Sequence, residues 1–276
     1  MTPREGEELF ELSMWGGAVE RRYRQLRPEV EKLPWHDFDV SKATPDALRS
    51  ARRTWTEAAF QEHRTGAACA ASLQALIAAR APIDLVAMAS RFALDEMVHV
   101  ELCARLAQML GGGAPLSYDP KHIIALPSPE LSPKLQASEL VIRNFCVGEA
   151  LSIPILRGSW HAARQPLIRA ILARIVKDEA AHGAFGWLYF DWALDLHDEA
   201  DRLHLAKEAA RTIDAVVSRW NDIPLVDDEH DDQRLGWMES RAYLDLAKRS
   251  LDRAVLKPLL ERGIDPRPHL TKSLDA

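Results

Sequence analysis

Apolar residues recur at helical spacing along most of the chain, and proline and glycine residues divide this pattern into segments. Helices are expected over residues 46–79, 83–110, 133–164, 166–196, 199–220 and 235–262. The pair Thr44-Pro45 fits a helix start, because threonine caps free N–H groups and proline suits the first turn. The run Gly111-Gly112-Gly113 fits a helix end, and Pro154 is expected to bend the third helix.

The order of these helices predicts how the chain is organised. Two helical hairpins separated by a long connection are the arrangement of a four-helix bundle with one crossover. Neither a short alternating run nor a hairpin turn signal predicts a β-strand. We therefore expect an all-α fold. It comprises a leader at 1–44 with helical potential between Glu7 and Val30, the bundle at 45–197, and a C-terminal helical extension packed on the bundle at 198–276.

Composition narrows the class of protein without fixing its chemistry. The chain has 276 residues, of which 47% are hydrophobic and 28% charged, with a net charge of −6, as expected for a soluble globular protein. It has no basic cluster to bind nucleic acid, and its longest uncharged stretch, 65–79, is too short to span a membrane. Three isolated cysteines predict neither a disulfide framework nor a thiolate metal site. The N-terminus lacks the pattern of a signal peptide, so we expect a cytoplasmic protein.

Two copies of one motif carry most of the chemical information. Asp95-Glu96-Met97-Val98-His99 lies in the second bundle helix, and Asp178-Glu179-Ala180-Ala181-His182 lies in the fourth. Positions i and i+3 share one face of a helix, so each Glu and its His point the same way. A single motif of this kind is weak evidence, but two copies on separate helices predict a metal site inside the bundle.

A metal pair in such a bundle also needs one carboxylate from each of the other two helices. Glu149 lies 30 residues before Glu179, and Glu62 lies 34 residues before Glu96. These separations are about what two antiparallel helices and a short turn require. Glu57, at a separation of 39 from Glu96, is the alternative ligand on the first helix.

The predicted ligand set has a consistent charge balance. Four carboxylates and two imidazoles neutralise two divalent cations, and an oxygen-rich shell with some nitrogen suits iron or manganese. Without metal, four buried acids would repel one another, and most would be protonated. The alternative is that these residues are ordinary surface glutamates and histidines.

The motifs resemble those of the ferritin-like di-iron carboxylate superfamily, and most closely those of bacterial stand-alone ferritin-like domain proteins. The resemblance covers about residues 45–197 and rests on EH (62–63), LDEMVHVELCARLA (94–107), CVGEA (146–150) and ARIVKDEAAH (173–182). It implies six metal ligands, namely Glu62, Glu96, His99, Glu149, Glu179 and His182. It also implies that Asp95 and Asp178 hold the metal-bound histidine of the opposite helix. Ser152 occupies the place of a threonine that assists proton delivery in soluble acyl desaturases; a hydroxyl bonded back to a helix carbonyl is the alternative.

The resemblance implies a function as well as a ligand set. We expect two iron ions, with manganese–iron or manganese pairs as alternatives, in an oxidoreductase that activates dioxygen to oxidise a small organic substrate. An external electron donor and a homodimeric assembly are both compatible with this function. Two other functions stay open. One is ferroxidase or iron handling, which uses the same ligands, and the other is a non-enzymatic helical binding module.

Overall fold

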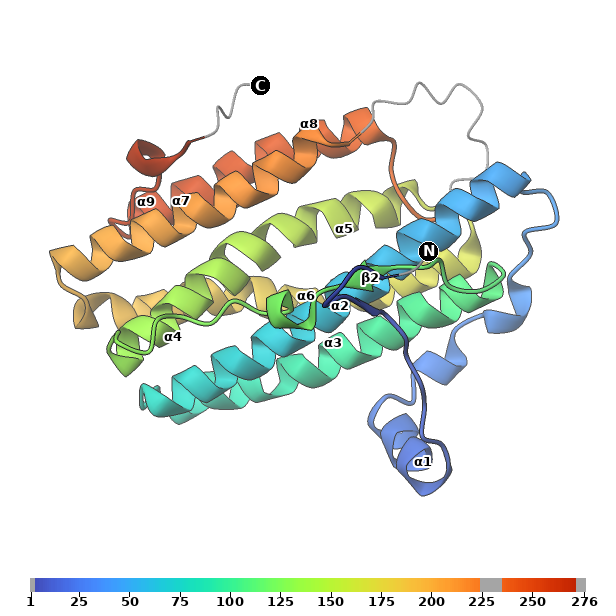
Figure 1. Cartoon of the computed structure of the whole chain (residues 1–276), viewed down its shortest axis with the longest axis horizontal. Helices are drawn as coiled ribbons and strands as arrows, with labels where there is room; N and C mark the ends of the chain where they lie inside the picture. The colour runs from blue at the N-terminus through green and yellow to red at the C-terminus, as the bar shows by residue number, and fades with distance from the viewer. Residues whose placement is uncertain (1–2, 224–234, 272–276) are drawn as a thin grey trace.

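Four long helical rods form the centre of the computed structural model, which describes residues 3–223 and 235–271 (Figure 1). Helices α2 (Pro45–Ala78) and α3 (Ile83–Met109) form the first hairpin. The second hairpin pairs a composite rod with α6 (Pro166–Ala193). That rod consists of α4 (Pro133–Val141), the π-helical segment η4 (Ile142–Glu149) and α5 (Ala150–Ala162). The all-α prediction is therefore confirmed.

The predicted start and stop signals act where the sequence places them. Thr44 Oγ1 accepts a hydrogen bond from the Ala47 N–H at 3.2 Å, and Pro45 occupies the first turn of α2. Helix α3 is followed by Gly111 and Gly112, which have φ angles of 110° and 106° that favour glycine. These local signals explain why the hairpin helices begin and end close to their predicted limits.

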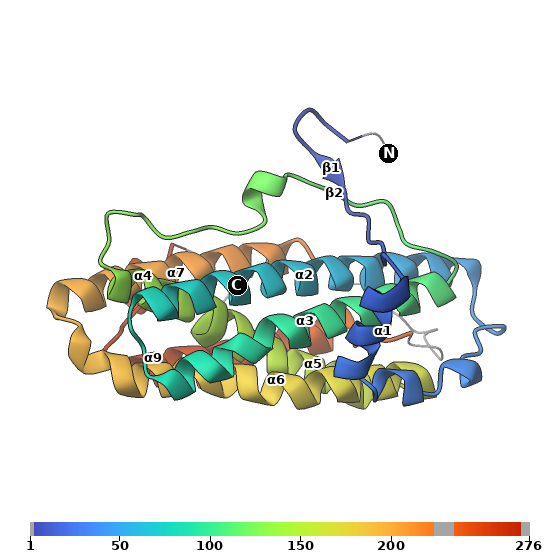
Figure 2. The same ribbon diagram turned by 90° about the horizontal axis from the view of Figure 1, so that it is seen from below.

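The prediction that the chain contains no strand is wrong in one place. Residues Glu8–Leu9 (β1) pair antiparallel with Ser117–Tyr118 (β2). This pair joins the N-terminal segment to the crossover, which runs along the outer side of α2 (Figure 2). Phe10 stabilises the junction by packing its ring 5.1 Å from that of Phe60. A two-residue ladder is too short to leave an alternating pattern in the sequence, so only tertiary contact creates it.

The leader is less helical than expected. Its only α-helix in the described residues is α1 (Gly17–Leu26), with the short 3-10 turns η1 (Val30–Lys32) and η2 (Trp35–Asp37) after it. Gly16 and Gly17 have φ angles of 82° and 60°, so an α-helix cannot continue back through them. The segment before them therefore lies outside the helix.

The third rod is irregular at η4, which ends five residues before the expected bend at Pro154. In the C-terminal part, α7 (Glu199–Asn221), α8 (Ser240–Ser250), the π-helical segment η6 (Leu251–Leu256) and α9 (Lys257–Glu261) pack on the bundle. The helix expected over 235–262 thus begins later and has a π-helical interior. Residues 224–234 and 272–276 lie outside the described residues. The division of the chain at 44 and 197 stays a prediction.

Buried apolar side chains form two clusters, one towards each end of the bundle. Along α3, for example, Phe92 belongs to one cluster and Leu102 to the other, and along α6 the two clusters contain Ile175 and Phe185. The polar residues of the repeated motif lie between these clusters on both helices. Within the described residues, no helix is long and apolar enough to cross a membrane.

Candidate metal centre

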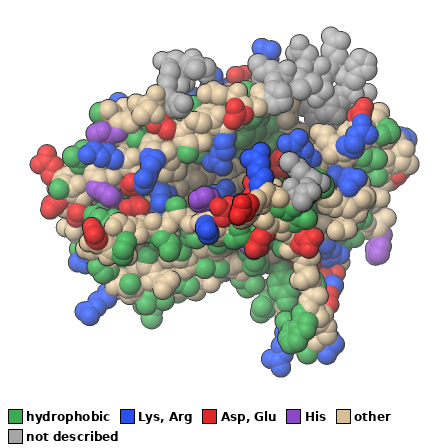
Figure 3. Space-filling view, viewed as in Figure 1, with side chains coloured by type: hydrophobic (Ala, Val, Ile, Leu, Met, Phe, Trp, Pro, Cys, Tyr) green, Lys and Arg blue, Asp and Glu red, His purple; other side chains and the backbone are tan. Residues whose placement is uncertain are grey.

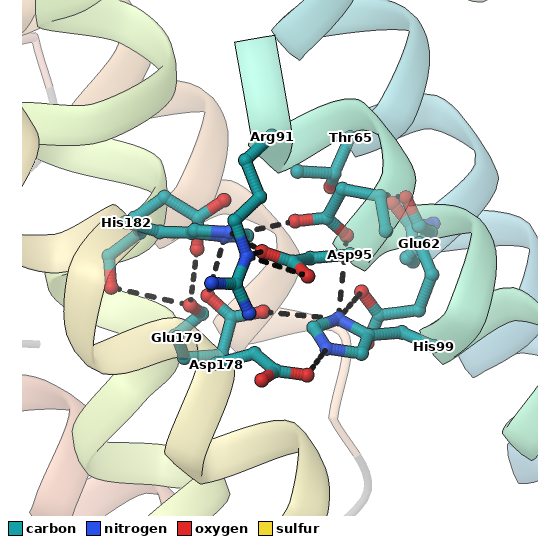
Figure 4. Close-up of polar contacts among 12 residues, drawn as sticks. Glu62, Thr65, Arg91, Asp95, His99, Asp178, Glu179 and His182 are labelled. Atoms are coloured by element: carbon teal, nitrogen blue, oxygen red, sulfur yellow. Dashed lines mark hydrogen bonds and ion pairs between the residues drawn. The ribbon is translucent and has the colours of Figure 1, made fainter. Parts of the chain in front are cut away.

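All six predicted ligands converge on one polar cluster inside the bundle (Figure 4). They are Glu62 on α2, Glu96 and His99 on α3, Glu149 at the end of η4, and Glu179 and His182 on α6. Glu96, His99 and His182 are completely buried, while the side chain of Glu62 keeps 16% of its surface exposed. Four different rods therefore place ionisable groups in the interior, where each needs a charged or hydrogen-bonding partner.

The cluster divides into two overlapping groups of four residues. One group contains Glu62 and His99, the other contains Glu149 and His182, and both contain Glu96 and Glu179. Within each group, one ligand atom from every residue lies within 4.8 Å of the others. Each group could therefore hold a metal ion, and Glu96 and Glu179 belong to both groups.

Distances around the two imidazoles fit ligands that share an ion. His182 Nδ1 lies 3.0 Å from Glu96 Oε1 and 3.1 Å from Glu179 Oε2. His99 Nδ1 lies 3.3 Å from Glu179 Oε1 and 3.6 Å from Glu62 Oε2. Atoms bound about 2.1 Å from one cation, at right or tetrahedral angles, are separated by about 3.0–3.4 Å. The observed separations are close to this range.

Several of these atoms have no hydrogen-bond partner although they are buried. Among the described residues, neither carboxylate oxygen of Glu96 makes a hydrogen bond, and the same holds for Glu179 Oε2, His99 Nδ1 and both ring nitrogens of His182. Unsatisfied buried atoms of this kind are costly and uncommon. Because these residues belong to the two groups of closely spaced ligand atoms, they fit a metal site whose cations would satisfy most of the unpartnered atoms.

The pKa values of the clustered side chains also fit a metal site. Burial raises the pKa of the Glu149 carboxyl well above its ordinary value, and nearby carboxylates raise it further. Burial also raises the pKa of Glu62 to about 8. Burial by itself would lower the pKa of His99, but its contacts with Glu179, Glu62 and Glu96 outweigh burial and raise it. The metal-free cluster therefore retains protons, which bound cations would replace.

Each histidine is also contacted by the aspartate of the opposite motif. His99 Nε2 on α3 lies 3.2 Å from Asp178 Oδ2 on α6, within hydrogen-bonding distance. His182 Nε2 on α6 lies 3.7 Å from Asp95 Oδ2 on α3. A carboxylate at the outer nitrogen orients the ring and directs the other nitrogen towards the cluster. Asp178 is at hydrogen-bond distance from its histidine and Asp95 is farther from its own; the role of both aspartates beside a metal stays a prediction.

Two arginines that the sequence reasoning missed complete this outer layer. Arg91 Nε lies 3.1 Å from Asp95 Oδ2, and Arg174 contacts Asp178 in the same i,i+4 relationship. The signal was present in the sequence, because Arg precedes Asp by four residues in both copies of the motif. The full repeat therefore reads RxxxDExxH. Its arginines hold the aspartates that in turn contact the histidines.

Ser152 contacts the cluster through Glu149. Its hydroxyl is 3.1 Å from both the main-chain carbonyl oxygen of Glu149 and the side-chain Oε2 of the same residue. The hydroxyl thus makes the hydrogen bond to a helix carbonyl that was the alternative prediction for Ser152. It also contacts the side chain of the predicted ligand Glu149. Glu149 is the last residue of the π-helical segment, and such segments are frequent at functional sites.

Glu57, the alternative to Glu62, lies outside the cluster. Its side chain is half exposed and pairs with Arg53 at 2.8 Å, one turn earlier on α2. Glu62, whose side chain is 16% exposed, and Glu57 both line an open cavity of about 700 Å³. Glu149, Glu179 and Ser152 line the same cavity. A small molecule entering it would therefore reach the ligand cluster directly.

Comparisons of the chain with protein-family models, curated proteins and solved structures find no significant match. The class of protein is therefore defined by fold and site alone. The chain is an all-α protein with a buried cluster of carboxylates and histidines that could hold metal ions.

Proposed function

We propose that the chain is a ferritin-like di-metal carboxylate protein. Glu96 and Glu179 would bridge two ions, and Glu62 with His99 and Glu149 with His182 would complete the two sites. Iron is the metal we favour, with manganese–iron or manganese pairs as alternatives, because the ligand set mixes carboxylate oxygen and imidazole nitrogen. The observation that supports this proposal most strongly is the overlap of the two ligand groups at two shared carboxylates.

We further propose that the protein is an oxidoreductase that uses dioxygen to oxidise a small organic molecule. A bound pair of redox-active ions would supply electrons to dioxygen. A two-electron oxidation of the substrate provides two of the four electrons that conversion of dioxygen to water requires. An external donor would provide the other two.

The chain's own residues would bind ions, orient ligands and manage protons. Asp178 would orient the ring of His99 through the contact at its Nε2, and Asp95 would do the same for His182 from a longer distance. The Ser152 hydroxyl is in position to pass a proton to or from Glu149 Oε2. The ring of Phe92 lies 4.3 Å from that of His182 and keeps water from this side of the cluster.

The cavity favours substrate oxidation over iron storage or a purely structural role. Its wall includes aliphatic and aromatic side chains, such as Leu151, Ile155 and Trp220, beside the carboxylates. An apolar wall of this kind suits an organic molecule and offers little to a hydrated iron ion. The cavity therefore supports an enzyme with an organic substrate.

The test begins with metal content per chain in protein purified without added metal and after anaerobic loading with ferrous iron. About two ions per chain are expected, and Glu96→Ala should lose most of them. The exposed Glu57→Ala is the matched control and should retain both. Oxygen uptake by the ferrous protein is then compared with that of the same amount of free iron.

Each outcome separates the candidate functions. Oxygen uptake above the free-iron control supports the oxidoreductase. Ferroxidase activity with a mass above about twenty subunits would instead support iron storage. A folded protein that binds no ion after ferrous loading would overturn the metal proposal and leave a helical binding module.

A further inference from the structure

The cavity that reaches the ligand cluster has a second, basic side. Its wall includes Arg64 on α2, Arg143 on η4 and Arg219 on α7. On the face viewed in Figure 3, lysine and arginine side chains gather along the hollow between the helices at the top and those at the bottom. In a chain with a net charge of −6, the cavity wall thus carries three arginines in addition to its four glutamates.

Arg64 is held in place with donors to spare. Its Nη1 donates to Gln61 Oε1 at 3.1 Å, and its Nε lies 3.5 Å from the carbonyl oxygen of Ile123 in the crossover. A guanidinium has five N–H groups, so three are left for a ligand. Its neighbours orient Arg64, and none of the contacts described supplies a negative charge.

The three arginines differ in how their charge is balanced. Arg143 has a carboxylate partner, because its Nη2 lies 3.4 Å from Glu139 Oε1. Within the described part of the chain, neither Arg64 nor Arg219 has an acidic side chain at ion-pair distance. Burial lowers the pKa of Arg64, and the positive charge of Arg219 lowers it further. Two guanidinium groups thus repel across a shared cavity, and an anion between them would relieve the repulsion.

The ligand cluster would not provide that anion once metal is bound. Four carboxylates balance two divalent cations, so the loaded cluster is close to neutral. The charge of Arg64 and Arg219 would then remain uncompensated on the cavity wall. Between the two ends, Leu151, Ile155 and Trp220 provide apolar surface. A volume of about 700 Å³ is typical of pockets for small molecules.

We propose that this cavity binds an organic anion, with its carboxylate or phosphate group at Arg64 and Arg219 and its apolar part directed towards the ligand cluster. The description of this anion as the substrate rests on the proposed oxidoreductase function, whereas its binding does not. Arginine suits either anionic group, because its planar fork donates two parallel hydrogen bonds to carboxylate or phosphate oxygens.

The test is isothermal titration calorimetry with three probes that share one alkyl chain: octanoate, octyl phosphate and 1-octanol. Titrations use manganese-loaded and metal-free protein at low ionic strength. Octanoate or octyl phosphate should bind, and 1-octanol should bind at least about tenfold more weakly. The tighter of the two anions identifies the headgroup as carboxylate or phosphate.

Arginine variants locate the binding site. Arg64→Gln and Arg219→Gln should each weaken anion binding at least about tenfold and leave 1-octanol unchanged. Arg49→Gln on α2 and Lys207→Gln on α7 are matched controls, because both side chains are exposed and neither lines the cavity. Arg219 is exposed, so its substitution tests the proposal even if Arg64→Gln disturbs the crossover.

Equal affinity for octanoate, octyl phosphate and 1-octanol would overturn the proposal, as would wild-type anion binding in both cavity variants. Metal content is measured on the same samples. If the protein binds metal but no anion, the anion-site proposal is wrong and the metal-site proposal still holds. If the protein binds the anion but no metal, the anion-site proposal holds and the proposed oxidoreductase function is wrong.

Discussion

Nε2 of His99 lies 3.2 Å from Oδ2 of Asp178, although 79 residues separate them in the chain. The contact joins α3 to α6, and the contact between His182 and Asp95 joins the same helices in the opposite direction at 3.7 Å. Each copy of the motif therefore places a carboxylate beside the histidine of the other copy, at hydrogen-bond distance for His99 and farther away for His182. This reciprocal arrangement links the two helices at the ligand cluster.

Removal of one of these carboxylates should weaken metal binding. We expect Asp178→Ala to lower the affinity for manganese by about 10–100-fold, because His99 loses the group that orients its ring. Asp95→Ala should have a smaller effect, since its distance to His182 is longer. Titration of metal-free protein measures both affinities. Asp191→Ala, at an exposed position of α6, is the control, and equal affinities in all variants would contradict the prediction.

Glu62 and Glu57 provide a matched pair on one helix. Glu62→Ala should lower the metal content by at least one ion per chain, because it removes a member of one ligand group. Glu57→Ala should leave metal content unchanged, because this side chain pairs with Arg53 at the surface. Elemental analysis of both variants after ferrous loading measures the number of ions bound per chain. Loss of metal in Glu57→Ala alone would show that the first-helix ligand is misassigned.

The three cysteines should react slowly in the folded protein. Cys69, Cys103 and Cys146 are buried, and burial raises the pKa of each thiol above its ordinary value. A raised pKa lowers the fraction of reactive thiolate at pH 8. Mass spectrometry after iodoacetamide treatment should show little alkylation of native protein and three modifications in denaturant. Rapid alkylation of the native protein would indicate that these sites open readily.

Substitution of Gly186 by alanine should destabilise the protein, although such a substitution inside a helix usually stabilises it. Replacement of glycine by alanine inside a helix normally stabilises a protein by about 1 kcal/mol. At Gly186 on α6, an added Cβ would lie 2.7 Å from Cys146 Sγ and 3.1 Å from the main-chain nitrogen of Cys146. We therefore expect Gly186→Ala to lower the free energy of unfolding by about 1–3 kcal/mol. Urea denaturation measures the change, and a more stable variant would contradict the expected overlap.

Local signals in the sequence predicted most of the fold. Caps such as Thr44 and stops such as Gly111 act within one helical turn, so the helices of the bundle could be placed from the chain alone. The pairing of β1 with β2 and the π-helical form of η4 could not be predicted, because both depend on neighbours distant in sequence. The leader was predicted as more helical than it is, since the φ angles of Gly16 and Gly17 were not foreseen.

For the candidate site, the sequence determined which residue types occur at helical spacing. Two DExxH copies and two further glutamates were sufficient to predict a metal cluster, because i and i+3 positions share a face in any helix. Only the tertiary structure decided that Glu62 lies in the cluster while Glu57 does not, since the helix rotation is set by packing against its neighbours. The tertiary structure also brought Arg64 and Arg219, 155 residues apart in the chain, to one cavity. Helical periodicity is a local property, whereas a cavity exists only where separate helices meet.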